Sequence, residues 1–232
     1  MTRGTIVWAQ ALMDQHFHPL DYFANVDKYH LHLPHWRQRD VTYFVTWRLA
    51  DSLPKSRLDQ LRAEQEAWLR THQIRSKDEV KTLPEHLRWE YQQMFTARVH
   101  EWLDSGMGSC ALREPGCSAI VVDALRYFDG ERYALDAFVV MPNHVHVLVR
   151  PLTGWKLEKV LHSWKSFTAK TINQATGKQG VLWLEESWDH IVRSLAQLEH
   201  FRLYIRENPV KARLSQGEFV LGCGGGLKTD AV

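Results

Sequence analysis

Two histidines separated by one residue, His144 and His146, are the first candidates for chemistry in this sequence. They follow the turn-forming pair Pro142-Asn143 and lie in a run where valine takes every second position. Alternate residues of a strand share a face, so both imidazoles would point to one side, about 7 Å apart along the strand. Imidazole is the commonest metal-ligating side chain, and this pair could hold one divalent ion. Taken alone, the pattern more often marks two surface histidines on a half-buried strand.

A second candidate group is Tyr204 with Asn208, four residues apart and therefore on one side of a helix. At 100° per residue, Tyr204 falls on the flank of the apolar stripe from Leu198 to Ile205, where its hydroxyl can stay free for chemistry. The simpler interpretation is a tyrosine at the edge of the core. Asn208 precedes Pro209, so its spacing favours a helix N-cap over a metal ligand.

Alternation and helical periodicity predict the elements that must position these residues. Residues 41–49 and 133–141 alternate like strands, and residues 144–150 complete a β-hairpin with the second of these runs. Apolar residues at helical spacing predict helices around residues 58–69, 87–102, 120–128, 157–172 and 195–207. The short apolar run at 181–186 is interpreted as the fourth strand. The order strand, helix, hairpin, helix, strand, helix favours an α+β fold with a small antiparallel sheet.

The domain organisation follows from these elements. Residues 1–38 are interpreted as an N-terminal arm, residues 39–215 as the main domain and residues 216–232 as a flexible tail. The helical stretch at about 55–117 is expected to be an insertion in that domain.

Composition narrows the class of protein. The 232 residues carry a net charge of +2, but residues 150–215 hold 11 Lys or Arg against 6 Asp or Glu, so this segment is +5 and the rest is −3. A basic C-terminal third suits a local phosphate-binding surface, although charge alone slightly favours incidental charge on a solvated helix face. No apolar run is long enough to span a membrane and no secretory signal is evident. Three cysteines with no zinc spacing are expected to be free thiols, so we expect a cytoplasmic protein.

Four segments together resemble the REP-associated tyrosine transposases, which are single-tyrosine insertion-sequence transposases of the HUH endonuclease superfamily. Met-Pro-Asn-His-Val-His at 141–146 is similar to the metal-binding signature of that family. Tyr204 followed by Asn-Pro-Val-Lys-Ala at 208–212 is similar to its tyrosine-helix signature. The strand at 42–49 and the segment at 188–193 also match, and the resemblance covers about residues 33–215.

The resemblance implies a ferredoxin-like antiparallel sheet with helices packed on it. It implies that Tyr204 is the nucleophile, that His144 and His146 bind a divalent metal, Mg²⁺ or Mn²⁺, and that Asn208 completes the metal shell. Relatives often have a longer glutamine where this chain has Asn208, and the insertion at 55–117 exceeds the minimal family core. The implied activity is single-stranded DNA cleavage and strand transfer through a 5′-phosphotyrosine, on hairpin or palindromic DNA, by a monomer or homodimer.

DNA-contacting residues are expected in the basic third of the chain. We expect lysines and one arginine to meet phosphates and one tryptophan to stack on bases. They are Lys156, Lys159, Lys165, Lys170, Trp183, Lys211 and Arg213. Two other functions stay open: a protein that binds DNA hairpins without cutting them, and a metal-dependent hydrolase in which Tyr204 is structural.

Overall fold

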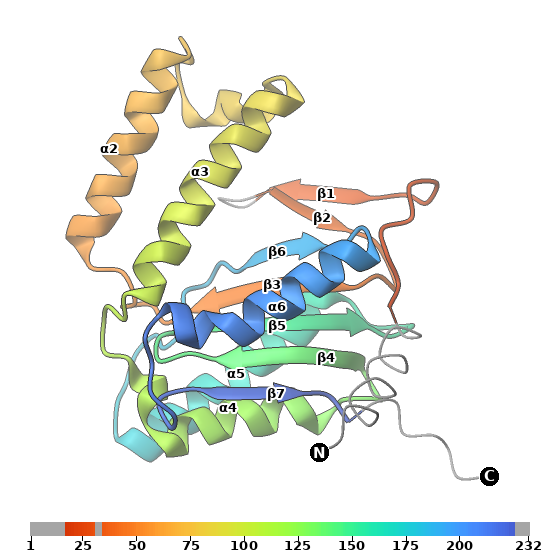
Figure 1. Cartoon of the computed structure of the whole chain (residues 1–232), viewed down its shortest axis with the longest axis vertical. Coiled ribbons are helices and arrows are strands. Elements are labelled where there is room, and N and C mark those ends of the chain that lie inside the picture. Colours follow the sequence, from red (N-terminus) through yellow and green to blue (C-terminus); the bar gives the residue numbers. More distant parts are fainter. Residues whose placement is uncertain (1–16, 31–33, 226–232) are drawn as a thin grey trace.

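The computed structural model describes residues 17–30 and 34–225 and consists of a β-sheet, helices on both its faces and a projecting helical hairpin (Figure 1). Its strands are β1 (Asp27–His30), β2 (Pro34–Arg37), β3 (Tyr43–Arg48), β4 (Tyr133–Val140), β5 (His144–Pro151), β6 (Trp188–Ile191) and β7 (Val220–Cys223). Its α-helices are α2 (Lys55–Thr71), α3 (Glu85–Asp104), α4 (Pro115–Tyr127), α5 (Leu157–Thr176) and α6 (Leu195–Lys211). Two short 3₁₀ helices are η1 (Lys77–Thr82) and η2 (Ala111–Arg113).

The main sheet has five antiparallel strands in the order β6-β3-β5-β4-β7. Without β7, the chain runs β3, α4, β4, β5, α5, β6, which is the β-α-β-β-α-β order of a ferredoxin-like fold. The expected α+β class and ferredoxin-like sheet are therefore confirmed. The predicted hairpin is also confirmed, because β4 and β5 pair directly with Val140 opposite Val145.

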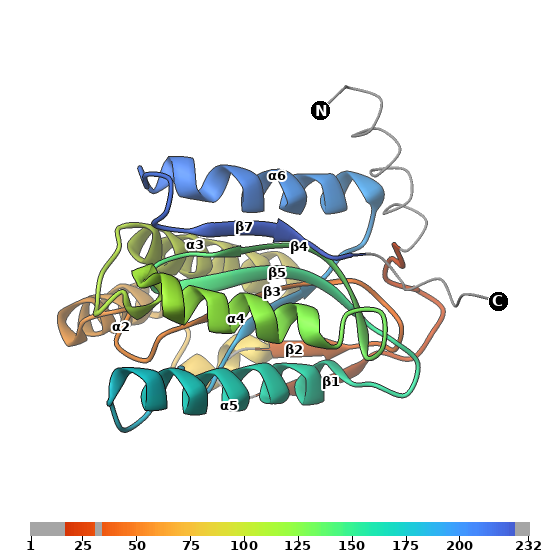
Figure 2. The same cartoon turned by 90° about the horizontal axis from the view of Figure 1, so that it is seen from below.

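Helices cover both faces of this sheet (Figure 2). The valines at 145, 147 and 149 of β5 pack with α4 and α5 in the larger core cluster. Phe44 and Leu148 point to the other face, where they pack with Leu198 and Ile205 of α6. This two-sided cover explains why β3 is buried along almost its whole length, although its alternation suggests a half-buried strand.

The fourth strand of the ferredoxin-like order is β6, so its assignment to residues 181–186 is wrong. Within 181–186, Trp183 forms only an isolated bridge with Leu49. Its indole is buried in the larger core cluster, which accounts for the apolar run without a strand. The polar residues Asp189 and His190 of β6 concealed the real strand, which pairs with β3.

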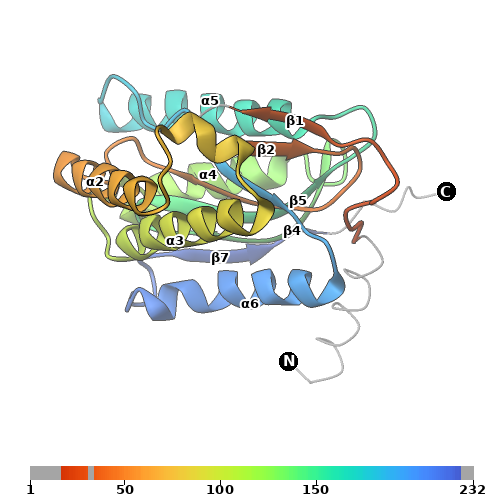
Figure 3. The same cartoon turned by 90° about the horizontal axis from the view of Figure 1, so that it is seen from above.

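The insertion between β3 and α4 is a helical hairpin, α2 and α3, that projects from the sheet (Figures 1 and 3). Its outer part has its own apolar cluster, which includes Trp68, Tyr91 and Phe95. Near the sheet, Leu53, Trp102 and Leu103 form a smaller cluster at the base of the hairpin. The C-terminal end of α3 therefore lies against the main domain, next to the end of β3.

Gly108 fixes the loop that follows α3. Its φ is +85°, and a Cβ at this position would lie 2.4 Å from the carbonyl oxygen of Asp51. The neighbouring amide of Ser109 donates to Oδ2 of Asp51 at 3.0 Å. Glycine is required because no other residue allows both this backbone conformation and this close approach.

The chain segments outside the expected main domain are partly ordered into strands. In the expected N-terminal arm, β1 and β2 form a two-stranded sheet; residues 1–16 and 31–33 lie outside the described residues. The prediction of a flexible tail from residue 216 onward is wrong for residues 220–223, because they form β7, which pairs with the edge of β4. Residues 226–232 lie outside the described residues. All three cysteines are free, as expected. No helix among the described residues is long and apolar enough to cross a membrane.

Candidate active site

The site is built around the imidazoles of His144 and His146 on β5. Both side chains are buried, and their Nε2 atoms lie 2.9 Å apart. β5 is the central strand of the sheet, so its backbone is held on both sides by β3 and β4. Two neighbouring nitrogen ligands of one ion lie about 3.0 Å apart when the metal–nitrogen bonds are about 2.1 Å long and the angle between them is 90°. The separation of the two ring nitrogens matches this value.

The other ring nitrogen of each histidine is held by a polar neighbour. Nδ1 of His144 lies 2.7 Å from Oδ1 of Asn143, and Nδ1 of His146 lies 2.7 Å from Oγ1 of Thr46 on β3. Asn143 is itself oriented, because its Nδ2 donates to the carbonyl oxygens of Leu103 and Met107 at 3.2 and 2.9 Å. His144 must therefore donate from Nδ1, which leaves the lone pair of its Nε2 free.

Tyr204 lies on α6 directly beside this pair. Its ring meets the ring of His146 edge to face, with centroids 5.1 Å apart, and packs in the same way against Phe44. Its hydroxyl lies 3.4 Å from Nδ1 of His100 on α3. The position on the flank of the apolar stripe thus brings the phenol ring to His146.

Asn208 is one turn further along α6 and fully buried. Its Nδ2 lies 3.3 Å from Nε2 of His146. The N-cap favoured by spacing is wrong, because α6 continues through Pro209 to Lys211. Among the described residues, Oδ1 of Asn208 has no hydrogen-bond partner. A buried oxygen left unpaired is costly, and a cation beside it would remove that cost.

Two residues of α3 that the sequence did not single out also face this centre. Oδ1 of Asp104 lies 3.7 Å from Nε2 of His144, and His100 is one turn earlier on the same helix face. In sequence, both are 40 or more residues from the histidine pair, within a helix that resembles an ordinary amphipathic one. Their spacing of four residues was the one available signal, and nothing in the sequence showed which way that face points.

Burial sets the charge states of these groups. Burial lowers the pKa of His144 to about 3 and of His100 to about 4, and it lowers the pKa of His146 well below its usual value. All three rings are therefore neutral at pH 7 and keep a lone pair. Burial, together with the nearby Asp104 carboxylate, raises the pKa of Tyr204, while a hydrogen bond with Asn208 lowers it. The free phenol thus stays protonated at neutral pH.

Residues 125–208 match the family model described as "Transposase IS200 like". This match covers 84 of the 232 residues, so the chain is similar to the IS200-like transposases over that segment. It begins at the end of α4, includes both histidines and Tyr204, and ends at Asn208. No curated protein matches the chain. Among solved structures, the chain is similar to a REP-associated tyrosine transposase bound to a REP hairpin, with 17% identity and a TM-score of 0.35 over 83% of this chain and 73% of the other.

A divalent cation would fit the donors of this site. The imidazole pair offers two neutral nitrogens, and Asn208 offers a buried oxygen without a partner. Among residues 17–30 and 34–225, no three His, Cys, Asp or Glu side chains form a ready-made metal cluster, so the imidazole pair needs further oxygen ligands to complete a metal shell. A set of imidazole and oxygen donors suits Mg²⁺ or Mn²⁺ and also zinc.

The residues expected to contact DNA are not all near this site. Lys156, Lys159, Lys165 and Lys170 lie at the start of or along α5, which covers the opposite face of the sheet from α6 (Figure 2). Lys165 donates to the carbonyl oxygen of Glu185 at 2.5 Å.

Trp183 is not available to stack on a base. It is 4% exposed, and its Nε1 donates to Oγ1 of Thr168. The prediction that Trp183 stacks on a DNA base is therefore wrong, because the indole is part of the core.

Lys211 and Arg213 are exposed at and just after the C-terminal end of α6. Lys211 Nζ lies 5.7 Å from the centre of the Tyr204 ring and pairs with Glu207 at 3.2 Å. Of the expected contacts, Lys211 is thus the one that the structure brings next to the tyrosine.

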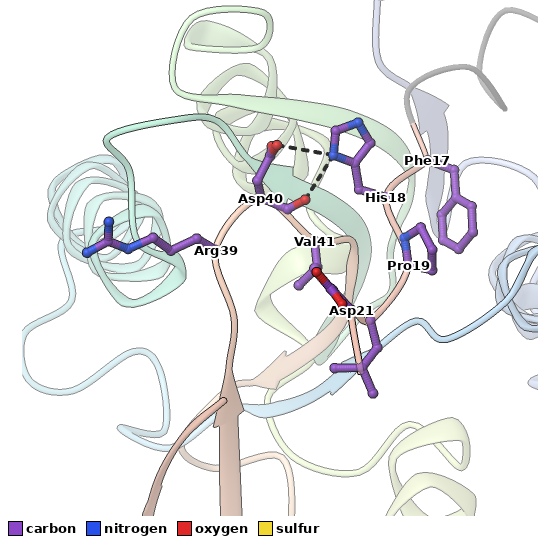
Figure 4. A pocket seen from close by; sticks show the side chains of 8 residues that line it. Phe17, His18, Pro19, Asp21, Arg39, Asp40 and Val41 are labelled. Atoms are coloured by element: carbon purple, nitrogen blue, oxygen red, sulfur yellow. Dashed lines mark hydrogen bonds and ion pairs between the residues drawn. The ribbon is translucent and has the colours of Figure 1, made fainter. Parts of the chain in front are cut away.

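A hollow of about 470 Å³ lies at the other end of β3 (Figure 4). There, Nδ1 of His18 contacts the backbone oxygen and the carboxylate of Asp40, at 3.0 and 3.1 Å. Val41 lines the hollow, whereas His144 pairs with Arg48, seven residues further along the chain and about 23 Å away in an extended strand. It is therefore separate from the histidine pair.

Proposed function

We propose that this chain is a metal-dependent nuclease and strand transferase of single-stranded DNA in which Tyr204 is the nucleophile. The observation that carries the proposal is the position of the Tyr204 ring, 5.1 Å from the ring of His146 in a buried pair of converging imidazoles. A phenol beside two neutral metal-binding nitrogens suits attack on a phosphodiester. The transposase family of residues 125–208 supports DNA as the substrate.

In the proposed reaction, the phenolic oxygen of Tyr204 forms a bond to phosphorus and the bond between phosphorus and the 3′ oxygen breaks. The phenolic proton passes to solvent, and the departing oxygen takes a proton from solvent to become a 3′-hydroxyl. The phosphate stays on Tyr204 as a 5′-phosphotyrosine. Attack by another 3′-hydroxyl reverses the step and joins strands without ATP, because the covalent link preserves the energy of the broken bond.

The protein groups have separate tasks in this reaction. His144, His146 and Asn208 would hold the divalent cation, which when bound polarises a non-bridging phosphate oxygen. Asn143 and Thr46 keep the two rings in place. His100 accepts a hydrogen bond from the tyrosine hydroxyl and orients it.

The proposed substrate is single-stranded or hairpin DNA, because the phosphate has to enter between α6 and β5. Lys211 is exposed beside the tyrosine and would contact the DNA backbone there. All proposed groups come from one chain, so a monomer could carry out the cleavage, and a homodimer would contain two such sites.

The test is incubation of the protein with short hairpin DNAs and Mn²⁺, followed by denaturing electrophoresis. The wild type should form a protein–DNA adduct that survives denaturation, and Tyr204→Phe should not. Tyr127→Phe is the matched control, because Tyr127 is 76% exposed on α4, across the sheet. Hairpin binding without any adduct would instead support the alternative of a DNA-binding protein without catalytic activity.

A further inference from the structure

The end of the inserted hairpin is fastened to the metal-binding strand. The carbonyl oxygens of Leu103 in α3 and Met107 in the following loop both accept hydrogen bonds from the Asn143 side chain. The opposite side of that amide holds Nδ1 of His144. The insertion thus takes part in orienting a histidine of the site, which a separate appended lobe would not do.

The last residue of α3 places a carboxylate at the same point. Oδ1 of Asp104 lies 3.7 Å from Nε2 of His144, and one cation about 2.1 Å from each atom can reach both, since such a pair of ligands can be up to about 4.2 Å apart. The Asp104 side chain is 23% exposed. Its Oδ1 atom is buried and accepts no hydrogen bond from any described residue.

Asp104 is unusual for a surface acid. Its side chain lies near the end of α6, where it interacts with Asn208 and with the charge of Lys211. Buried carboxylate oxygens normally have a donor or a cation beside them. Two side chains of the proposed metal site, His144 and Asn208, interact with Asp104, and both are neutral groups.

We infer that Asp104 is a metal ligand supplied by the inserted hairpin, which makes the site two imidazoles, one amide and one carboxylate. The inference rests on the proposed function, since it extends the same metal site. It gives the insertion a task in the chemistry of the enzyme. A carboxylate adds a negative charge and a hard oxygen, both of which favour Mg²⁺ and Mn²⁺ over softer metals.

The experiment is a calorimetric titration of the full chain with Mn²⁺ and, separately, with Zn²⁺. Asp104→Asn keeps the shape of the side chain and removes its charge, and we expect it to weaken Mn²⁺ binding at least tenfold and Zn²⁺ binding less. Asp123→Asn is the control, because Asp123 is exposed on α4 across the sheet, and it should bind both metals like the wild type.

Thermal unfolding in EDTA separates ligation from a structural role. A ligand carboxylate stabilises only the metal-bound protein. Without metal, Asp104→Asn should therefore unfold at the wild-type temperature or above it. Added Mn²⁺ should raise the unfolding temperature of Asp104→Asn less than it raises that of the wild type. Asp104→Ala should give the same result, and it is used in place of Asp104→Asn if that variant does not fold.

Unchanged Mn²⁺ affinity in Asp104→Asn would overturn the assignment of Asp104 alone. A wild-type protein that binds no Mn²⁺, or binds it as tightly after His144→Ala, would overturn the metal site and with it the proposed function. The two failures are therefore distinguishable in the same titrations.

Discussion

The hydroxyl of Tyr204 lies 3.4 Å from Nδ1 of His100, although 104 residues separate them in sequence. One turn further along each helix, Asn208 of α6 and Asp104 of α3 also interact. Two helices thus meet through side chains spaced four residues apart, and His146 of the sheet faces both Tyr204 and Asn208. The inserted α3 and the sheet therefore both contact the tyrosine.

Removal of the His100 ring should slow the chemistry more than DNA binding. His100→Ala leaves the Tyr204 hydroxyl without its acceptor, and we expect the rate of adduct formation to fall about 10- to 100-fold. The rate is measured by quenched incubation with hairpin DNA and Mn²⁺. The control is His86→Ala, which removes an exposed imidazole from the same helix. Equal rates for His100→Ala and wild type would remove His100 from the mechanism.

Asn143 should control the affinity of the histidine pair for metal. Asn143→Ala frees the ring of His144 to turn, and loss of such a supporting hydrogen bond typically weakens metal binding about 10- to 100-fold. The carbonyl oxygens of Leu103 and Met107 also lose their donor, so the free energy of unfolding should fall by about 1–3 kcal/mol.

The effect of Asn143→Ala on metal affinity is measured by Mn²⁺ titration, and its effect on stability is measured by urea unfolding. Asn173→Ala is the comparison, because Asn173 of α5 donates one side-chain hydrogen bond to Gly180 on the other side of the sheet. Wild-type Mn²⁺ affinity in Asn143→Ala would mean that His144 is held by other contacts.

Gly108→Ala should destabilise the junction of the insertion with the sheet. The added Cβ would lie 2.4 Å from the backbone oxygen of Asp51 in a left-handed backbone conformation, so we expect a loss of about 2–4 kcal/mol in the free energy of unfolding. Gly116→Ala in α4 has open space around its Cβ, so it should be neutral or stabilise by up to about 1 kcal/mol. Urea unfolding measures both, and similar values for the two variants would contradict the close packing at Gly108.

Active sites should not be shared between two copies of the chain. The Tyr204 and His146 that meet here belong to the same chain, so a mixture of Tyr204→Phe with a His144→Ala, His146→Ala double variant should form no adduct. A mixture of wild type with either variant is the positive control. Recovery of adduct in the mixed variants would show that α6 exchanges between copies in solution.

Much of the fold follows from local patterns in the sequence. Alternation in β3 and in the β4–β5 hairpin, together with helical spacing in α5 and α6, determines the strand and helix order of a ferredoxin-like sheet. β6 was misplaced because the polar residues Asp189 and His190 break the apolar pattern in a short edge strand. The apolar run before it belongs to the core through Trp183.

The site was predictable where its residues are close in sequence or belong to a known motif, as for the histidine pair, Tyr204 and Asn208. Asp104 and His100 were not predictable, because their role depends on how the α2–α3 hairpin lies against the sheet, which local patterns do not specify. The lysines of α5 were expected to contact DNA, but α5 lies on the opposite face of the sheet from Tyr204. A helical charge pattern gives the exposed face of a helix but not the side of the sheet on which the helix packs.

The most direct test of the central proposal is to locate the DNA on the protein. The denatured adduct is digested with nuclease and with a protease that cleaves after lysine, which releases the peptide of residues 179–211, and Tyr204 is its only tyrosine. The account predicts that this peptide carries a nucleotide linked through its 5′-phosphate to Tyr204, and that Tyr204→Phe yields the unmodified peptide. A nucleotide on another residue, or cleaved DNA with no covalent adduct at any time, would contradict it.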